Sequence, residues 1–230
     1  MERVALVVAP HPDDAEIAMG GTIAALVSQG VRVVVLDLTD GEPTPHGSPE
    51  IRASETAEAS RILGLTERHN LGITNRTVFD SVETRSAVAN VIREVRPELL
   101  FAPYWEDAHP DHVEASKLVD GARFYSKFVK SDLRYQPWYP RKELYFFSTH
   151  LKVRYAPSFV FDISQHLETK ISALSAYGSQ FRENARNMGR IEQVRREALY
   201  WGDQVGVAAG EPFLAREAIK VEGAAALFSV

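Results

Sequence analysis

Residues 4–14 read VALVVAPHPDD and outline a strand, a loop and the start of a helix. The six apolar residues from Val4 to Ala9 predict a short strand buried on both faces of a parallel sheet. The Pro10-His11-Pro12 step ends that strand, because proline cannot donate to a strand ladder. From Asp13 onward the apolar residues follow helical spacing as far as Gly30, which is placed to stop the helix.

The same strand-and-helix unit repeats along the first half of the chain. Apolar or β-branched runs predict further strands at 31–38, about 69–71 and 99–102, and helical patterns separate them at 50–63 and about 82–95. This alternation predicts an α/β fold, in which a Rossmann-like, doubly wound and mostly parallel sheet lies between two helical layers.

The second half of the chain is less regular. After about Gly121 we expect two more strands, at 143–148 and 158–163, and then a long helical region from 165 to about 200. The sequence shows no internal repeat and no linker. We therefore expect a single domain over 1–230, with a Rossmann-like core to about residue 120 and an extension of strands and helices from about 121 to 230.

Composition excludes several classes of protein. The 230 residues include no cysteine, which excludes thiolate metal sites, cysteine nucleophiles and disulfide scaffolds. The formal net charge of -5 disfavours a polyanion such as nucleic acid as a partner. The apolar run near Met1 is too short for a signal-peptide core or a membrane span, so we expect a cytoplasmic protein without a membrane partner.

Two similar clusters of ionisable residues each follow a predicted buried strand, His11-Pro12-Asp13-Asp14 and His109-Pro110-Asp111-His112. In open parallel sheets the loops at the carboxyl ends of the strands line the crevice where ligands bind. The two clusters are therefore expected to meet there, with three histidines and three aspartates in a small volume. A divalent metal would both neutralise and coordinate such a group.

The donor types indicate which metal and which chemistry. Two histidines and one aspartate suit zinc, and a catalytic zinc with three protein ligands keeps a position for water, whose pKa falls to roughly 7. The same donors form the facial triad of non-haem iron oxygenases, which is the alternative from another class, although the predicted fold disfavours it. A noncatalytic nucleotide-binding module is also disfavoured, because His-Pro-Asp-Asp stands where a G-x-G-x-x-G turn is expected.

The first cluster, with Ala9-Pro10 before it and Glu16-Ile17 and Gly20-Gly21-Thr22-Ile23 after it, resembles the first motif of the zinc-dependent N-acetylglucosaminyl deacetylases, the PIG-L or LmbE-like family. The second cluster resembles that family's second motif. The resemblance implies an LmbE-like fold and one Zn2+ per chain, with Fe2+ or another divalent ion as the alternative. It implies metal ligation by His11, Asp14 and His112, a general base in Asp13, transition-state stabilisation by His109, and orientation of His109 by Asp111.

Other stretches are similar to the subgroup that deacetylates N-acetylglucosaminyl-malate in bacillithiol synthesis, among them Leu38-Thr39, Gly41-Glu42, Gly47 and Arg52. Ala108 departs from this subgroup, in which many members have arginine. Arg52 offers a planar guanidinium suited to clamping the substrate's carboxylate. The resemblance thus implies an amino-sugar substrate, most closely the malate conjugate, with another N-acetylated amino sugar or small amide as the alternative. It also implies a homo-oligomer, with a hexamer as the expected form.

The remaining candidates have a simpler interpretation. Four histidines have no partnered spacing and are expected to be structural or surface residues: His46, His69, His150 and His166. Tyr200 or Trp201 could reach the pocket from the carboxyl-terminal region, but aromatic residues at helical spacing are more often in the core, where we expect both. The Gly20-Gly21 pair is explained by tight packing of a helix on the sheet as well as by a phosphate-binding loop.

Overall fold

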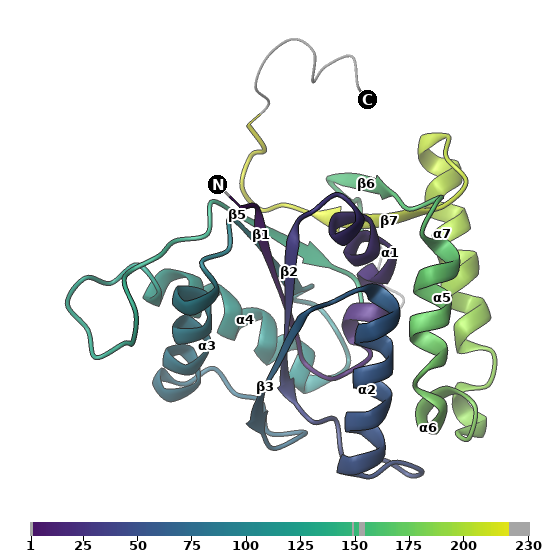
Figure 1. The fold of residues 1–230 in the computed structure, drawn as a ribbon, viewed down its shortest axis with the longest axis horizontal. Helices are drawn as coiled ribbons and strands as arrows, with labels where there is room; N and C mark the ends of the chain where they lie inside the picture. The colour runs from purple at the N-terminus through teal and green to yellow at the C-terminus, as the bar shows by residue number, and fades with distance from the viewer. Residues whose placement is uncertain (1, 149, 152–154, 221–230) are drawn as a thin grey trace.

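A seven-stranded sheet runs through the molecule, with helices on both of its faces (Figure 1). The computed structural model describes residues 2–148, 150–151 and 155–220. The strands are β1 (Val4–Ala9), β2 (Arg32–Thr39), β3 (Glu67–Ile73), β4 (Leu99–Pro103), β5 (Lys142–Phe146), β6 (Phe159–Asp162) and β7 (Gly210–Leu214). Their order is β3-β2-β1-β4-β5-β7-β6. Strands β1 to β5 pair in parallel, whereas β7 is antiparallel to both β5 and β6.

The first three helices lie close to their predicted bounds, whereas the fourth was not predicted. The helices are α1 (Asp14–Ser28), α2 (Pro49–Leu63), α3 (Val82–Val95), α4 (Pro110–Tyr125), α5 (Leu167–Ser175), α6 (Gly178–Phe181) and α7 (Arg190–Val205), with a 3-10 turn η1 (Ala185–Asn187). Helix α2 shows the local causes: the Ser48 side chain accepts a hydrogen bond from the Ile51 amide at 3.2 Å, and Pro49 follows it. Gly64 then ends the helix in the left-handed conformation, with φ 75°.

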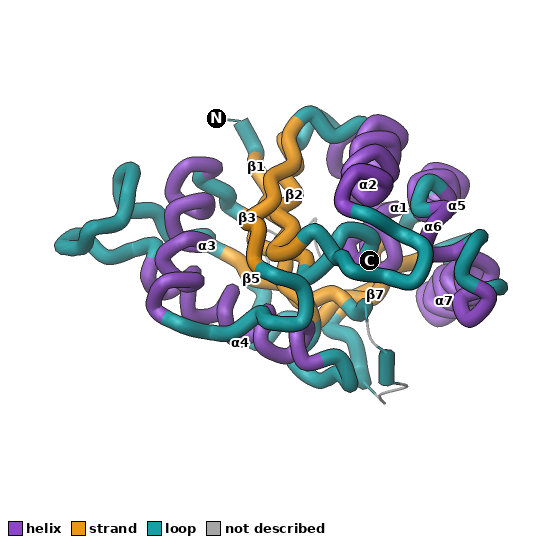
Figure 2. Tube along the Cα trace, turned by 90° about the horizontal axis from the view of Figure 1, so that it is seen from below, coloured by secondary structure: helices purple, strands orange, loops and turns teal. Residues whose placement is uncertain are grey.

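Strand β1 is buried on both faces, as predicted, and its side chains alternate between two cores. Val4, Leu6 and Val8 pack with residues of α3 and α4, while the alternate residues pack with α1, α2 and α5. Figure 2 shows α3 and α4 on one side of the strands and α1, α2, α5 and α7 on the other. The predicted three-layer α/β arrangement with a mostly parallel sheet is confirmed.

The carboxyl-terminal part differs from the expectation in two respects. The helical region from 165 to 200 is not continuous, because the backbone leaves the helical conformation at Tyr177 and because Gly189, with φ 86°, stands before α7. Strand β7 was not predicted, since a five-residue segment with Pro212 in its middle carries a weak strand signal. It lies between β5 and β6 and so joins β6 to the rest of the sheet.

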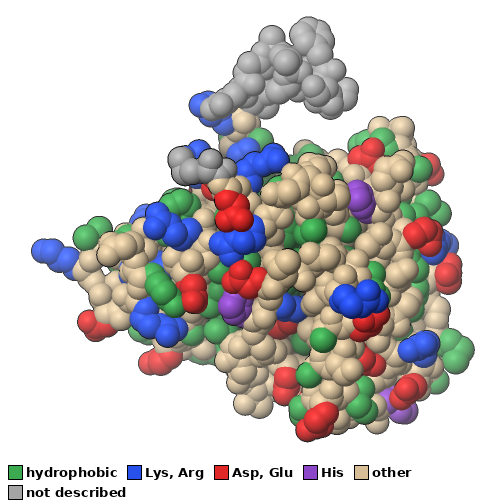
Figure 3. Space-filling view, viewed as in Figure 1, with side chains coloured by type: hydrophobic (Ala, Val, Ile, Leu, Met, Phe, Trp, Pro, Cys, Tyr) green, Lys and Arg blue, Asp and Glu red, His purple; other side chains and the backbone are tan. Residues whose placement is uncertain are grey.

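The face of the molecule seen in Figure 1 carries charges of both signs. In the space-filling view, Lys and Arg side chains are interspersed with Asp and Glu side chains, and hydrophobic side chains are scattered between them (Figure 3). A nucleic-acid surface requires a cluster of basic residues. On this face basic and acidic side chains alternate, and the expectation of no nucleic-acid partner stays a prediction.

Candidate active site

The two motifs meet at the carboxyl ends of the neighbouring strands β1 and β4, as predicted. Val7 of β1 pairs with Phe101 of β4, and each strand runs into one of the two motif loops. The centroid of the His11 imidazole ring lies 4.8 Å from that of His109 and 5.3 Å from that of His112. Strand order reverses at β1, with β2 on one side and β4 on the other, so the motifs lie at the crevice that this topology creates.

The expected ligand set, His11, Asp14 and His112, is brought together by the fold. Each residue offers one ligand atom, and these atoms lie within 4.8 Å of one another. Oδ2 of Asp14 lies 3.2 Å from Nδ1 of His11 and 3.3 Å from Nε2 of His112. Among the described residues, the buried Nε2 of His112 makes no hydrogen bond of ordinary geometry, and Asp14 lies only within ion-pair distance of it. Two imidazoles and one carboxylate that converge in this way fit a divalent metal.

Two residues outside the motifs hold the ligands in place. Nδ1 of His112 lies 2.7 Å from Oδ2 of Asp107 and 2.9 Å from the carbonyl oxygen of Ser148, so in the neutral ring Nδ1 carries the proton and Nε2 has the lone pair that a metal could bind. The Ser148 hydroxyl also donates to Oδ1 of Asp14 at 2.6 Å. Neither residue belongs to a predicted motif, although Asp107 stands only two positions before the second motif.

The acidic surroundings favour protonated histidines as long as no metal is bound. Burial opposes a charge on His11, but hydrogen bonds with Asp111 and Asp14 raise its pKa to about 9. Burial likewise opposes a charge on His112, and Asp14 and Asp107 raise its pKa to about 10. Since a metal binds the neutral imidazole, binding must release these protons.

Asp13 lies between the ligands His11 and Asp14 and is tied to α2. Its Oδ2 accepts a hydrogen bond from Nη1 of Arg52 at 3.1 Å. The backbone of Asp13 is left-handed, with φ 111°, which non-glycine residues adopt rarely and often at functional sites. Burial raises the pKa of Asp13 to about 7, although the charge of Arg52 opposes this. A carboxylate with that pKa is suited to accept a proton near neutral pH.

The second motif differs in detail from the expectation for Asp111. Its carboxylate does not orient the His109 ring; Oδ2 lies 3.2 Å from Nε2 of His11, and both oxygens accept backbone N–H bonds from Arg76 and Val78. Nδ1 of His109 instead accepts the backbone N–H of Asp111 at 3.2 Å. Burial, with the neighbouring His11 and His112, lowers the pKa of His109 to about 4. The ring is therefore neutral near pH 7 and carries its proton on Nε2.

Arg52 also differs from the expectation of a free clamp for a substrate carboxylate. The residue is 3% exposed, and its Nε donates to Oε1 of Glu42 at 3.2 Å. Its Nη1 donates to the carbonyl oxygen of Pro12 at 2.9 Å as well as to Asp13. Nε and Nη1 thus have protein acceptors, so Arg52 fixes the first motif loop and Asp13 in this structure. Arg52 also lines the cavity, and its contact with the substrate stays a prediction.

Comparison with known proteins agrees with these motifs. The family model for PIG-L, GlcNAc-PI de-N-acetylase, matches residues 6–122. The chain belongs to the PIG-L family. It is 32% identical over 216 residues to diacetylchitobiose deacetylase of Thermococcus kodakarensis, which covers 87% of this chain and 78% of the relative. It is 31% identical over 197 residues to a probable N-acetyl-alpha-D-glucosaminyl L-malate deacetylase 2 of Bacillus cereus, covering 78% of this chain and 84% of the relative.

A solved structure shows that this PIG-L-family chain shares its fold with a relative along almost its full length. The conserved protein TT1542 from Thermus thermophilus superposes with a TM-score of 0.88 at 38% identity, covering 96% of this chain and 98% of that chain. The predicted family is confirmed, and with it the assignment to a family of deacetylases. Across the described residues, the helices are all too short or too polar to cross a membrane.

A cavity of about 930 Å³ opens from the motifs toward the carboxyl-terminal helices. Its wall includes His11, Asp13 and Asp14 from the motif side and Gln180, Tyr200 and Trp201 from the far side. The two aromatic residues therefore face the cavity, and Tyr200 is 55% exposed, which corrects the expectation of core residues. His150 is also at the site, with Nδ1 at 3.4 Å from Oδ2 of Asp107.

Proposed function

We propose that this PIG-L-family chain is a zinc-dependent N-deacetylase that hydrolyses the acetamide of an N-acetylglucosamine conjugate. The observation that carries the proposal is the triad His11, Asp14 and His112 in one cavity with Asp13, within a chain of this family. A bound zinc would polarise the acetamide carbonyl and lower the pKa of a water molecule. The protein residues would then supply proton transfer and hydrogen bonding.

The proton-transfer roles follow from the protonation of the side chains. Asp13 lines the cavity beside the ligands His11 and Asp14, so it is placed to accept the proton of the attacking water and deliver it to the leaving amine. The neutral His109 lines the same cavity and has its proton on Nε2, so it can donate to the oxygen on which negative charge develops. The oxygenase alternative has no support of this kind, because these roles are hydrolytic.

For the substrate we propose the malate conjugate, supported by the likeness to the Bacillus relatives. The acid-binding role passes from Arg52 to Arg76. Arg76 lines the cavity, is exposed and donates through Nη2 to the carbonyl oxygen of Pro43 at 2.9 Å. Among the described residues its guanidinium forms no ion pair with a carboxylate, so it is available to one on the substrate.

Released acetate tests the substrate with three compounds: N-acetylglucosaminyl-malate, diacetylchitobiose and free N-acetylglucosamine. We expect the highest kcat/KM for the malate conjugate. A charge-assisted bond is worth roughly 1.5–3 kcal/mol, so Arg76→Gln should lower kcat/KM by about 10- to 150-fold for this substrate and much less for the two neutral ones. Equal losses on all three compounds would show that Arg76 does not bind the acid of the substrate. If the wild type preferred diacetylchitobiose, the proposed substrate would carry a second sugar in place of malate.

Metal analysis of the purified protein tests the centre. We expect one zinc per chain and its loss in His112→Ala, because two ligands hold a catalytic zinc poorly. His109→Ala should keep stoichiometric zinc and lose activity. If His112→Ala kept zinc and activity, the ligand set would be refuted. If His109→Ala lost zinc, His109 would be the ligand and His112 would have the role assigned to His109. Turnover dependent on iron and 2-oxoglutarate would support the oxygenase.

A further inference from the structure

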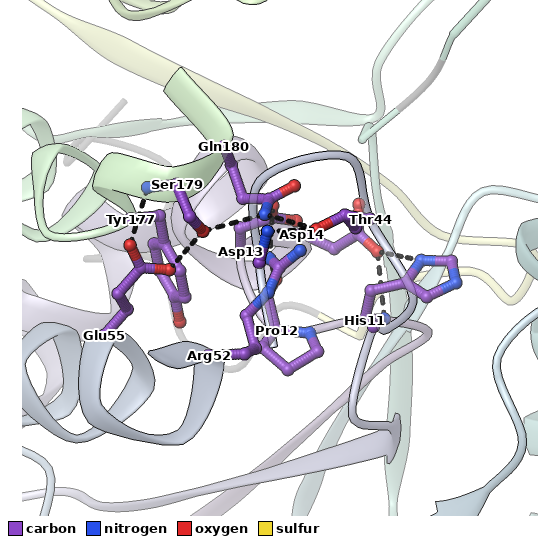
Figure 4. Close-up of polar contacts among 12 residues, drawn as sticks. His11, Pro12, Asp13, Asp14, Thr44, Arg52, Glu55, Tyr177, Ser179 and Gln180 are labelled. Carbon is purple, nitrogen blue, oxygen red and sulfur yellow. Dashed lines mark hydrogen bonds and ion pairs between the residues drawn. The ribbon is translucent and has the colours of Figure 1, made fainter. Parts of the chain in front are cut away.

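Gln180 shares the cavity with the metal motifs but has no role in the reaction proposed above. It lies in the short helix α6, is 7% exposed and lines the cavity together with Asp13 and Asp14. Figure 4 shows its amide between Ser179 and Thr44, beside the first motif. The role of this amide depends on whether its oxygen Oε1 or its nitrogen Nε2 is available to a ligand.

Two hydroxyl groups determine how this amide is oriented. The Thr44 hydroxyl donates to the carboxylate of Glu42 at 2.9 Å, and the Ser179 hydroxyl donates to Oε2 of Glu55 at 2.7 Å. A carboxylate accepts hydrogen bonds, so each hydroxyl has given away its only proton. Both oxygens can then only accept, and they do so from Nε2 of Gln180, at 3.1 Å for Thr44 and 2.9 Å for Ser179.

The opposite orientation of the amide is excluded by the same protons. It would place Oε1 of Gln180 against two oxygen atoms that have no proton to donate, and neither contact would be a hydrogen bond. Both amide protons are therefore used inside the protein. Among the described residues, none donates a hydrogen bond to Oε1, which leaves this oxygen as an acceptor held in a fixed direction at the cavity wall.

We propose that Oε1 of Gln180 accepts a hydrogen bond from the amino sugar and makes Gln180 a specificity-determining residue. The proposal rests on the proposed deacetylation. The donor it selects is an O–H or N–H group of the sugar, either a ring hydroxyl or the acetamide N–H. Because the network of Thr44 and Ser179 holds the amide before the substrate arrives, little conformational entropy is lost when this bond forms.

The test compares Gln180→Met with a matched control, Gln193→Met. Both changes replace a glutamine of the cavity wall by an unbranched apolar side chain of similar length. Within the described part of the chain, Nε2 of Gln193 donates to Glu197 alone, at 2.8 Å. Each zinc-loaded protein is assayed on N-acetylglucosamine, its 3-, 4- and 6-deoxy analogues, and 2-O-acetylglucose, which lacks the N–H. The dissociation constant of N-acetylglucosamine and the Tm of each variant are measured in parallel.

We expect Gln180→Met to lower kcat/KM on N-acetylglucosamine by roughly 5- to 100-fold and Gln193→Met to change it by less than about twofold. One analogue should be nearly insensitive to Gln180→Met, because it lacks the group that Oε1 binds. A deoxy analogue would identify a hydroxyl, and the O-acetyl analogue would identify the N–H. An equal loss on every substrate would overturn the proposal and assign Gln180 a structural role.

The binding measurement separates this proposal from the proposed function. If the wild type binds N-acetylglucosamine but releases no acetate, deacetylation fails, and a weaker dissociation constant in Gln180→Met still supports Gln180 as a ligand contact. If the wild type deacetylates and the dissociation constant and kcat/KM are unchanged in Gln180→Met, deacetylation stands and the specificity role is refuted. If Gln180→Met folds poorly, Gln180→Asn is used in its place, because its side chain is one methylene shorter and moves the amide away from the ligand. The same analogue should then be insensitive to the substitution.

Discussion

In the proposed hydrolysis, Asp13 is the residue that accepts and delivers the proton. Asp13→Asn keeps an oxygen that can accept from Nη1 of Arg52 but removes the ability to take a proton. General acid-base catalysis contributes about 10²–10⁴-fold, so kcat should fall by that factor while the zinc content stays at one per chain. A loss below tenfold in fully metal-loaded Asp13→Asn would mean that another group takes the proton.

Contacts between individual site residues were predictable from the sequence only where those residues belong to a recognisable motif. The residue types and spacing of the two clusters indicated the ligands His11, Asp14 and His112, which the fold brings together. The partners of Arg52 and Asp111 were not predictable, because each depends on which residues of other loops approach it in three dimensions. The carboxylate of Glu42 neutralises the guanidinium of Arg52. The two residues lie ten positions apart, and this separation matches no recognisable motif.

Helix α1 carries the first motif and is fixed to the sheet through its glycines. The backbone N–H groups of Gly21 and Thr22 donate to the carboxylate of Glu211 in β7 at 3.0 and 2.7 Å. A Cβ atom at Gly21 would lie 2.7 to 2.9 Å from side-chain atoms of Ile163. Close packing of the helix, the simpler of the two explanations for the Gly20-Gly21 pair, accounts for this contact.

Gly21→Ala should therefore destabilise the fold by about 1–3 kcal/mol, the usual effect of overpacking a buried contact. Urea denaturation would show a lower midpoint with an unchanged slope. Ile163→Ala removes two of the three nearest atoms, Cδ1 and Cγ2, so the double variant should lose less stability than the sum of the two single changes. Additive losses would mean that the contact with these two atoms is not the cause.

Strand β5 contains a buried carboxylate that should make stability depend on pH. Burial and the charge of Asp120 raise the pKa of Glu143 to about 7, although Arg123 opposes this. The folded chain thus keeps this proton at pH values where the unfolded chain has released it. The contribution of Glu143 to the free energy of unfolding is then largest below its ordinary value of 4.5 and falls as the pH rises to about 7.

Glu143→Gln resembles the protonated side chain at every pH. We expect the variant and the wild type to have similar stability at pH 5 and the variant to be more stable at pH 8, by at most about 3 kcal/mol. Thermal denaturation at the two pH values measures the difference. A variant that is less stable than the wild type at pH 8 would show that the ion pair with Arg123, at 3.3 Å, outweighs the burial of the charge.

Helices and strands with a regular apolar pattern were predictable from the sequence. Helix ends that depend on a local change in the backbone conformation were not. The buried strand Val4–Ala9 has the predicted bounds, because six consecutive apolar residues suit a strand covered on both faces. The region after Gln165 was predicted as one helix, because its apolar spacing continues across the breaks at Tyr177 and Gly189. Those breaks place Gln180 and the amino-terminal end of α7 at the cavity.

Across the whole molecule, the two parts of the chain contribute differently to the site. The family model matches residues 6–122, which supply both metal motifs. Gln180, Tyr200 and Trp201 come from the remainder and form the far wall of the cavity. Both metal motifs therefore come from the part that the family model matches, whereas the rest of the cavity wall comes from both parts, since Arg76 also lines it. This wall carries no motif of comparable specificity, so the sequence indicated the class of reaction more closely than the substrate.

The assembly of whole chains gives the last prediction, a homo-oligomer with the hexamer as its expected form. Closed symmetric assemblies are the usual state of soluble oligomeric enzymes. Strand β3 lies at the edge of the sheet, and nearby Phe79 and Val82 are 63% and 58% exposed, which is consistent with a surface covered by another copy. Light scattering at micromolar concentration should give a mass that is a multiple of 25.6 kDa, six times this value for the hexamer. A mass near 25.6 kDa would establish a monomer, and the whole cavity wall would then have to come from a single chain.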